Sequence, residues 1–133
     1  MKSVFLGLLV LLVGLTGCAQ EGTAEKDHAL GDFIEVLKGQ GVDGELTIQG
    51  PLNEDMLYVA EYAISKFTST RIISIFKCKD EKGAEKNLQD SLKNDKLSGQ
   101  ARNGRYLMVA TFYPAEELAV GKIKKLFLDH KFE

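Results

Sequence analysis

The segment Arg71–Cys78 restricts the possible folds of this chain more than any other. It is rich in β-branched and aromatic residues, which favour an extended strand. Its apolar residues occupy both alternating phases: Ile72 and Ile73, then Ile75 and Phe76. A strand with one face in water usually alternates apolar and polar residues, whereas a strand covered on both faces need not. The pattern therefore predicts a central strand that is covered, at least in part, on both faces.

Two more regions are predicted to form strands. Glu45–Gln49 alternates apolar and polar residues and is closed by Gly50-Pro51, which is typical of a short strand and a turn. Asn103-Gly104 is the strongest turn signal, because both residues tolerate the positive φ angles of a type I′ hairpin turn. We expect this turn to join a short arm near residues 100–102 to a long strand over residues 105–113.

The segment Asp55–Phe67 fits two structures. Six apolar residues at helical spacing fit one face of a helix: Met56, Val59, Ala60, Ala63, Ile64 and Phe67. Residues 62–67, followed by Thr68-Ser69-Thr70, also fit the first arm of a hairpin. We expect a helix at least as far as Ala60 and leave the remainder open.

Three segments are predicted to be helices. Asp27 can cap the first, which ends at Gly39 or Gly41, and Asp80 can cap the second, which runs to about residue 93. Pro114 suits the first turn of the last helix, where its missing N–H has no cost. The apolar faces consist of Leu30, Phe33, Ile34 and Leu37, then Ala84, Leu88 and Leu92, then Ala119, Ile123, Leu126, Phe127 and His130.

These elements together predict an α+β domain. We expect one domain over residues 27–133, with a small, mostly antiparallel sheet of three to four strands packed with three to four helices. A ferredoxin-like arrangement is one possibility. The length of 133 residues suits a single domain.

The first 18 residues have the features of a secretory signal. Lys2 supplies a positive charge, and Val4–Leu15 is apolar apart from glycine. Twelve residues are too few for a membrane-spanning helix, which needs about 20, but they suit the apolar region of a signal peptide. The sequence Leu15-Thr16-Gly17-Cys18 then resembles the lipobox of bacterial lipoproteins, in which an aliphatic residue, a small residue and Gly or Ala precede a cysteine.

This resemblance implies a location. In that family the cysteine thiol receives a diacylglyceryl group, the signal peptidase cuts between the positions of Gly17 and Cys18, and the new amino group is usually acylated. The predicted organisation is a signal peptide (1–17), a lipidated cysteine with a flexible tether (18–26) and the domain. Ala19 rather than aspartate follows the cysteine, which by the family rule favours the outer membrane, facing the periplasm, in a cell with two membranes.

The sequence contains few motifs that indicate catalysis or the binding of a cofactor or metal. Gly39-Gln40-Gly41-Val42-Asp43-Gly44 spells G-x-G-x-x-G, but it follows a predicted helix and precedes a strand, which is the reverse of a dinucleotide site. His28 and His130 form no pattern of metal ligands, so we expect no metal and no cofactor. The net charge of −2, with no basic stripe, argues against a nucleic-acid partner.

We expect a non-enzymatic binding or interaction module, held at the membrane by acyl chains on Cys18, with an envelope protein or a small ligand as its partner. Tyr106, Phe112 and Tyr113 could form a partner-facing patch, although packing in the core explains them better. The alternative is a small envelope enzyme or redox protein that uses Cys78 or clustered carboxylates. Cys78 shares a strand face with Phe76, which favours a buried thiol.

Overall fold

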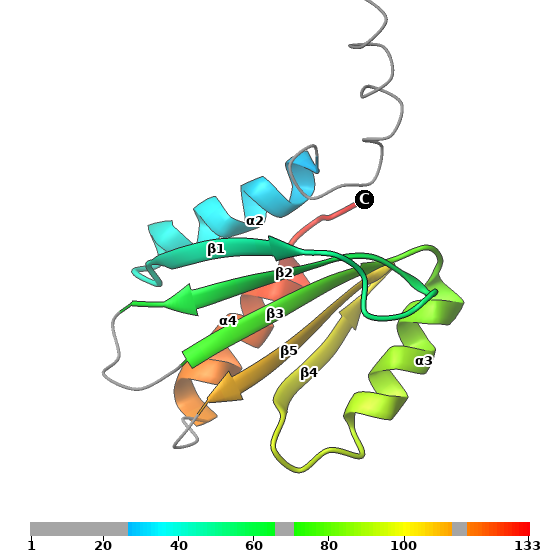
Figure 1. Ribbon diagram of the computed structural model, residues 1–133. Helices are drawn as coiled ribbons and strands as arrows, with labels where there is room; N and C mark the ends of the chain where they lie inside the picture. Colours follow the sequence, from blue (N-terminus) through cyan, green and yellow to red (C-terminus); the bar gives the residue numbers. More distant parts are fainter. Residues whose placement is uncertain (1–26, 66–70, 113–116) are drawn as a thin grey trace, which may run out of the picture.

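A computed structural model describes residues 27–65, 71–112 and 117–133 (Figure 1). The predicted signal peptide, Cys18 and the tether lie outside this part of the chain. The elements follow one another in the order α2 (His28–Gly39), β1 (Gly44–Gln49), β2 (Met56–Ile64), β3 (Arg71–Cys78), α3 (Glu81–Ser91), β4 (Ser98–Asn103), β5 (Tyr106–Phe112) and α4 (Glu117–Asp129).

The five strands form one sheet in the order β1-β2-β3-β5-β4, and every neighbouring pair is antiparallel. The predictions of an α+β fold, of a mostly antiparallel sheet and of β3 as its central strand are confirmed. The expected three to four strands were too few. The ferredoxin-like arrangement is wrong, because that fold is built on strand–helix–strand crossovers, whereas β1, β2 and β3 follow one another directly.

The additional strand is β2, so the predicted helix through Ala60 is wrong. The side chains of Tyr58, Ala60, Tyr62 and Ile64 alternate onto one face of the sheet and are buried there. Val59 is buried on the other face, and a bulge between Met56 and Tyr58 changes the phase of the strand. Apolar residues on both phases hide the two-residue period, and their spacing then imitates a helix.

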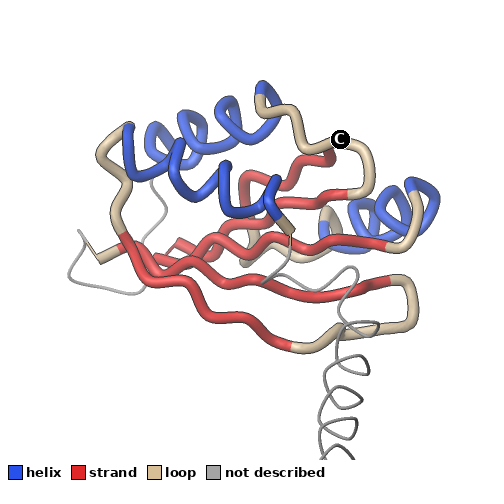
Figure 2. The backbone as a smooth tube through the Cα atoms, turned by 90° about the horizontal axis from the view of Figure 1, so that it is seen from above, coloured by secondary structure: helices blue, strands red, loops and turns tan. Residues whose placement is uncertain are grey.

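One face of the sheet, which we call the inner face, is covered by α2 and α4 (Figure 2). The apolar side of α2 packs there as predicted, with Leu30, Phe33, Ile34 and Leu37 all buried. Phe33, Phe127 and Phe132 join the two helices to the C-terminal segment, and the rings of Phe33 and Phe127 meet edge to face with centroids 5.8 Å apart. Such aromatic packing stabilises the layer beyond the burial of its area.

The opposite face, which we call the outer face, has less cover from the described elements. The single helix α3 packs on it through Ala84, beside a small buried cluster that also contains Met56, Val59 and Cys78. Asp80 caps α3 as predicted, since its Oδ1 accepts a hydrogen bond of 2.7 Å from the backbone N–H of Gly83. Leu92, expected on the inner side of this helix, is instead exposed just beyond its last turn.

The β4–β5 hairpin forms where predicted, but its turn differs from type I′. Asn103 still pairs with Tyr106, so the two turn residues are Gly104 and Arg105, and only Gly104 has a positive φ, of 64°. A two-residue turn with glycine first fits type II′. The side chain of Asn103 donates hydrogen bonds to the carbonyls of Phe127, in the last turn of α4, and of His130, the residue that follows this helix.

No helix in residues 27–65, 71–112 or 117–133 is both long and apolar enough to cross a membrane.

The start of β1 provides a stability test. A Cβ atom at Gly44 would lie 2.4 Å from the backbone oxygen of Ala63 on β2. We therefore expect Gly44→Ala to lower the free energy of unfolding by about 1–3 kcal/mol, since backbone must move to admit the methyl group. Gly121→Ala is the matched control, because nothing lies within 4 Å of its added Cβ and alanine is about 1 kcal/mol better than glycine in a helix. Urea denaturation of both variants measures the two effects, and a Gly44→Ala protein as stable as the parent would contradict the tight β1–β2 approach.

Candidate functional site

The structure separates the residues that could have supported nucleophilic chemistry. Cys78 is fully buried on the outer face. Burial, followed by the negative charges of Asp55 and Asp80, raises the pKa of this thiol to about 11. His130 lies in the inner layer, where its ring packs against Phe33 and Phe132. Because the reactive form of cysteine is the thiolate, this environment makes Cys78 a poor nucleophile.

The structure also locates most of the other residues that the sequence analysis singled out. Tyr106 is 1% exposed and belongs to the core, so it cannot form a partner surface. The side chain of Phe112 and all of Tyr113 lie outside the described residues. His28 is exposed on the first turn of α2. The glycine-rich segment 39–44 connects the end of α2 to the start of β1, so it does not precede a helix as a dinucleotide site requires.

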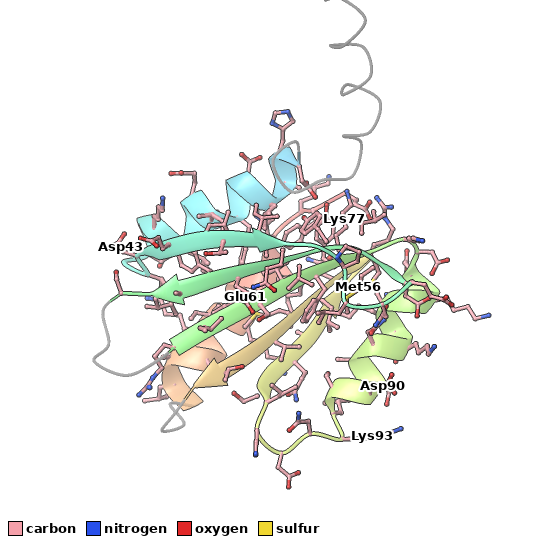
Figure 3. All side chains as sticks on the ribbon, viewed as in Figure 1. Asp43, Met56, Glu61, Lys77, Asp90 and Lys93 are labelled. Atoms are coloured by element: carbon pink, nitrogen blue, oxygen red, sulfur yellow. The ribbon has the colours of Figure 1, made fainter. Side chains whose placement is uncertain are left out.

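A polar cluster that the sequence did not reveal lies at the start of the domain. The strand register places Lys77 of β3 directly between Tyr58 of β2 and Tyr106 of β5, all on the inner face. Asp27 lies against them: its Oδ2 accepts hydrogen bonds from the hydroxyls of Tyr58 (2.8 Å) and Tyr106 (2.7 Å), and Lys77 Nζ is 3.3 Å away. In Figure 3, the labelled residue Lys77 lies close to the beginning of α2.

Asp27 thus joins the helix to the sheet. Its Oδ1 accepts hydrogen bonds from the backbone N–H groups of Ala29 and Leu30, as a helix cap does, while Oδ2 serves the cluster. The side chains of Asp27 and Lys77 are only 5% and 13% exposed. Burial alone would raise the pKa of Asp27, but the hydrogen bonds of the two tyrosines and the charge of Lys77 outweigh it and lower that pKa. Burial and the carboxylate raise the pKa of both tyrosines, which keeps them as donors. We interpret the cluster as a structural clamp.

The clamp predicts a pH dependence of stability. Since the folded-state pKa of Asp27 lies below its unfolded value of about 3.9, the stabilisation is complete above that value and is lost as the pH falls through the folded pKa. We expect Asp27→Asn to cost about 1.5–3 kcal/mol at pH 7, in the range of hydrogen bonds to charged groups. Its unfolding free energy should also fall less than that of the parent between about pH 5 and pH 2.

Denaturation at several pH values makes this measurement. Asp129→Asn is the control, because Asp129 pairs only with the exposed Lys125 and surface ion pairs contribute little. If the free energies of unfolding of the parent and of Asp27→Asn change with pH in parallel, ionisation of the Asp27 carboxyl group does not stabilise the fold.

A groove of about 300 Å³ lies on the outer face, between α3 and the strands β3 and β5. The labelled side chains of Met56 and Asp90 mark its position in Figure 3. Its floor is mostly apolar and consists of Met56, Phe76, Leu107 and Val109. Its polar lining consists of Asn53, Ser74, Asn87, Asp90, Ser91, Asn94 and Thr111, so only one lining side chain carries a charge.

The polar border of the groove is ordered by its own hydrogen bonds. Asn53 Nδ2 donates to Asn87 Oδ1 at 2.9 Å, and Asn87 Nδ2 donates to the carbonyl of Gly83 at 2.8 Å. Asn53 Oδ1 also accepts from the backbone N–H of Asp55 at 2.9 Å. A carboxamide nitrogen carries two hydrogens, and each of these two nitrogens uses one in the bonds described. Among the described residues, the second N–H of each nitrogen has no partner, so it can donate to a ligand.

A larger opening of about 450 Å³ lies by the C-terminal segment, but several of its polar groups are already engaged. There, Asn103 donates to main-chain carbonyls and Glu133 pairs with Arg105. Among the described residues, no three His, Cys, Asp or Glu side chains gather closely enough to hold a metal ion. The outer-face groove is therefore the candidate site.

Comparison with known proteins adds no relative. No family model matches the chain, and no curated protein or solved structure matches it.

Proposed function

We propose that this protein is a membrane-anchored lipoprotein that binds a short, uncharged peptide segment in the outer-face groove, without catalysing a reaction. The observation that carries the proposal is the combination of an apolar floor with a border of carboxamide and hydroxyl groups. Ligand sites are commonly apolar clefts with a few placed polar groups, and 300 Å³ is at the lower end of their usual size.

The chemistry of the lining favours a peptide over a charged small molecule. The free N–H groups of Asn53 and Asn87 can donate to a peptide carbonyl. Ser74, near the middle of β3, can either donate or accept. An apolar ligand side chain would lie on Phe76 and Val109. An anionic ligand would meet the carboxylate of Asp90, so an uncharged segment fits better than an anionic one.

The anchor is the second part of the proposal and depends on the lipobox. Leu15-Thr16-Gly17-Cys18 would be cut before Cys18, and the acyl chains would hold the domain at the cell envelope. In a cell with two membranes, we place it on the outer membrane, facing the periplasm. The alternative of a thiol enzyme has less support, because Cys78 is buried, its pKa is raised, and His130 lies on the other side of the sheet.

The groove is tested with two probes that differ only in charge, N-acetyl-leucine amide and N-acetyl-leucine as its carboxylate. We expect the amide to shift the NMR signals of Ser74, Val109 and Thr111, and the carboxylate to bind at least about tenfold more weakly, which corresponds to about 1.4 kcal/mol. The chain begins at residue 19 in this experiment, so that no acyl chains compete for the groove.

Two variants make the groove test specific. Thr111→Trp should block binding, because Thr111 lines the groove from an exposed position. Thr47→Trp is the matched control, since Thr47 is exposed on the same face of the sheet but belongs to β1, outside the groove. Equal binding of both probes, or binding that survives Thr111→Trp, would rule out the proposed ligand class.

The anchor is tested by metabolic labelling with radioactive palmitate in a bacterial host. The parent chain should become labelled and remain with the membrane fraction. Cys18→Ala should lose the label and leave that fraction, because no other cysteine precedes the domain. Label retained by Cys18→Ala, or a parent chain without label, would contradict lipidation at this residue.

A further inference from the structure

The outward side of α4 exposes apolar and basic residues together. Leu118 is 92% exposed at one end of the helix and Leu128 is 47% exposed at the other, the two being among the few large exposed hydrophobic residues described. Lys122 and Lys125 are exposed between them. The inward residues Val120, Ile123 and Phe127 are buried in the core. The exposed leucines are therefore not needed for the packing of this helix.

The described charged side chains of α4 are mainly lysines, whereas the neighbouring helix α2 also exposes the acidic residues Asp32 and Glu35. Lys124 neighbours the two exposed lysines, and Lys38 is exposed in the last turn of α2. The end of α2 is close to α4, since Lys122 Nζ lies 3.4 Å from the carbonyl oxygen of Gln40, the residue that caps α2. Asp129 is paired with Lys125 at 3.0 Å. Exposed leucines beside lysines are the composition of helices that lie on the surface of anionic bilayers.

The position of α4 agrees with a membrane beneath it. α4 and α2 cover the inner face of the sheet (Figure 2), and the tether would join the domain at Asp27, directly before α2. Residues 18–26 span at most about 30 Å when fully extended. A domain held so closely can rest α4 on the bilayer. The groove, on the opposite face, would then be directed away from it.

We infer that the outer surface of α4, defined by Leu118, Lys122, Lys124, Lys125 and Leu128, rests on the anionic lipid headgroups of the membrane that holds the anchor. The leucines enter the headgroup region and the lysines pair with lipid phosphates, so that the domain has a fixed orientation. This inference depends on the proposed lipid anchor. A single helix face is too small to hold the protein at a membrane by itself, and the anchor supplies the proximity.

The test uses the lipidated full chain in vesicles of phosphatidylcholine, either alone or with about one third phosphatidylglycerol. A polarity-sensitive dye is attached to a cysteine introduced as Leu118→Cys, with Gln89→Cys on the exposed side of α3 as the matched site. Labelling is specific because Cys78 is fully buried and Cys18 carries lipid. A second pair of variants changes charge: Lys122→Glu with Lys124→Glu, against Lys82→Glu with Lys86→Glu on α3.

We expect blue-shifted emission from position 118 in the anionic vesicles only, with no shift at position 89. Added salt should reverse the shift, and the α4 charge variant should lower the equilibrium constant for contact by about fivefold for each lysine removed, whereas the α3 variant should not. Incorporated protein with the same emission at both positions, or a shift indifferent to lipid charge, would overturn this inference alone. Protein that fails to enter either kind of vesicle would instead overturn the anchor, and this inference with it.

Discussion

The structure depends on the strand β3, whose two sides meet different surroundings. Ile73 and Ile75 project to the inner face and are fully buried under α2 and α4. Ser74 and Phe76 project to the outer face, where α3, a helix of 11 residues, provides the only helical cover among the described elements. Both outcomes follow from the same two-residue alternation of a strand. One side of β3 therefore faces the core and the other faces the groove, and a change in the register of this strand would disturb both.

The clamp at Asp27 holds the beginning of α2 against the inner face of the sheet. Its carboxylate caps α2 and accepts hydrogen bonds from tyrosines on β2 and β5, so one side chain joins three elements. The residue before α2 is also where the proposed tether ends. Buried ionised groups are tolerated only where they are paired and hydrogen-bonded, and this carboxylate satisfies both conditions.

Local patterns predicted most of the elements but none of the sites. The caps at Asp27 and Asp80, the apolar face of α2 and the central strand β3 were readable because each depends on neighbours in the sequence. The strand β2 was not readable, because helices from distant parts of the chain cover both of its faces, and apolar residues on both faces hide the two-residue period. The clamp joins residues 79 positions apart, Asp27 and Tyr106, and the groove combines three strands, a helix and two connecting segments. No spacing rule covers such distances.

The two proposals describe one arrangement, with the helical layer toward the membrane and the groove open to the other side. Its central claim is that the groove holds a ligand in the cell. The most direct measurement is photo-crosslinking in intact cells with benzoylphenylalanine at Asn94, which lines the groove, or at Gln89, which is exposed on α3 outside it. We expect a discrete adduct at position 94 that Thr111→Trp abolishes, and none at position 89. No adduct at position 94, or the same adducts at both positions, would contradict it.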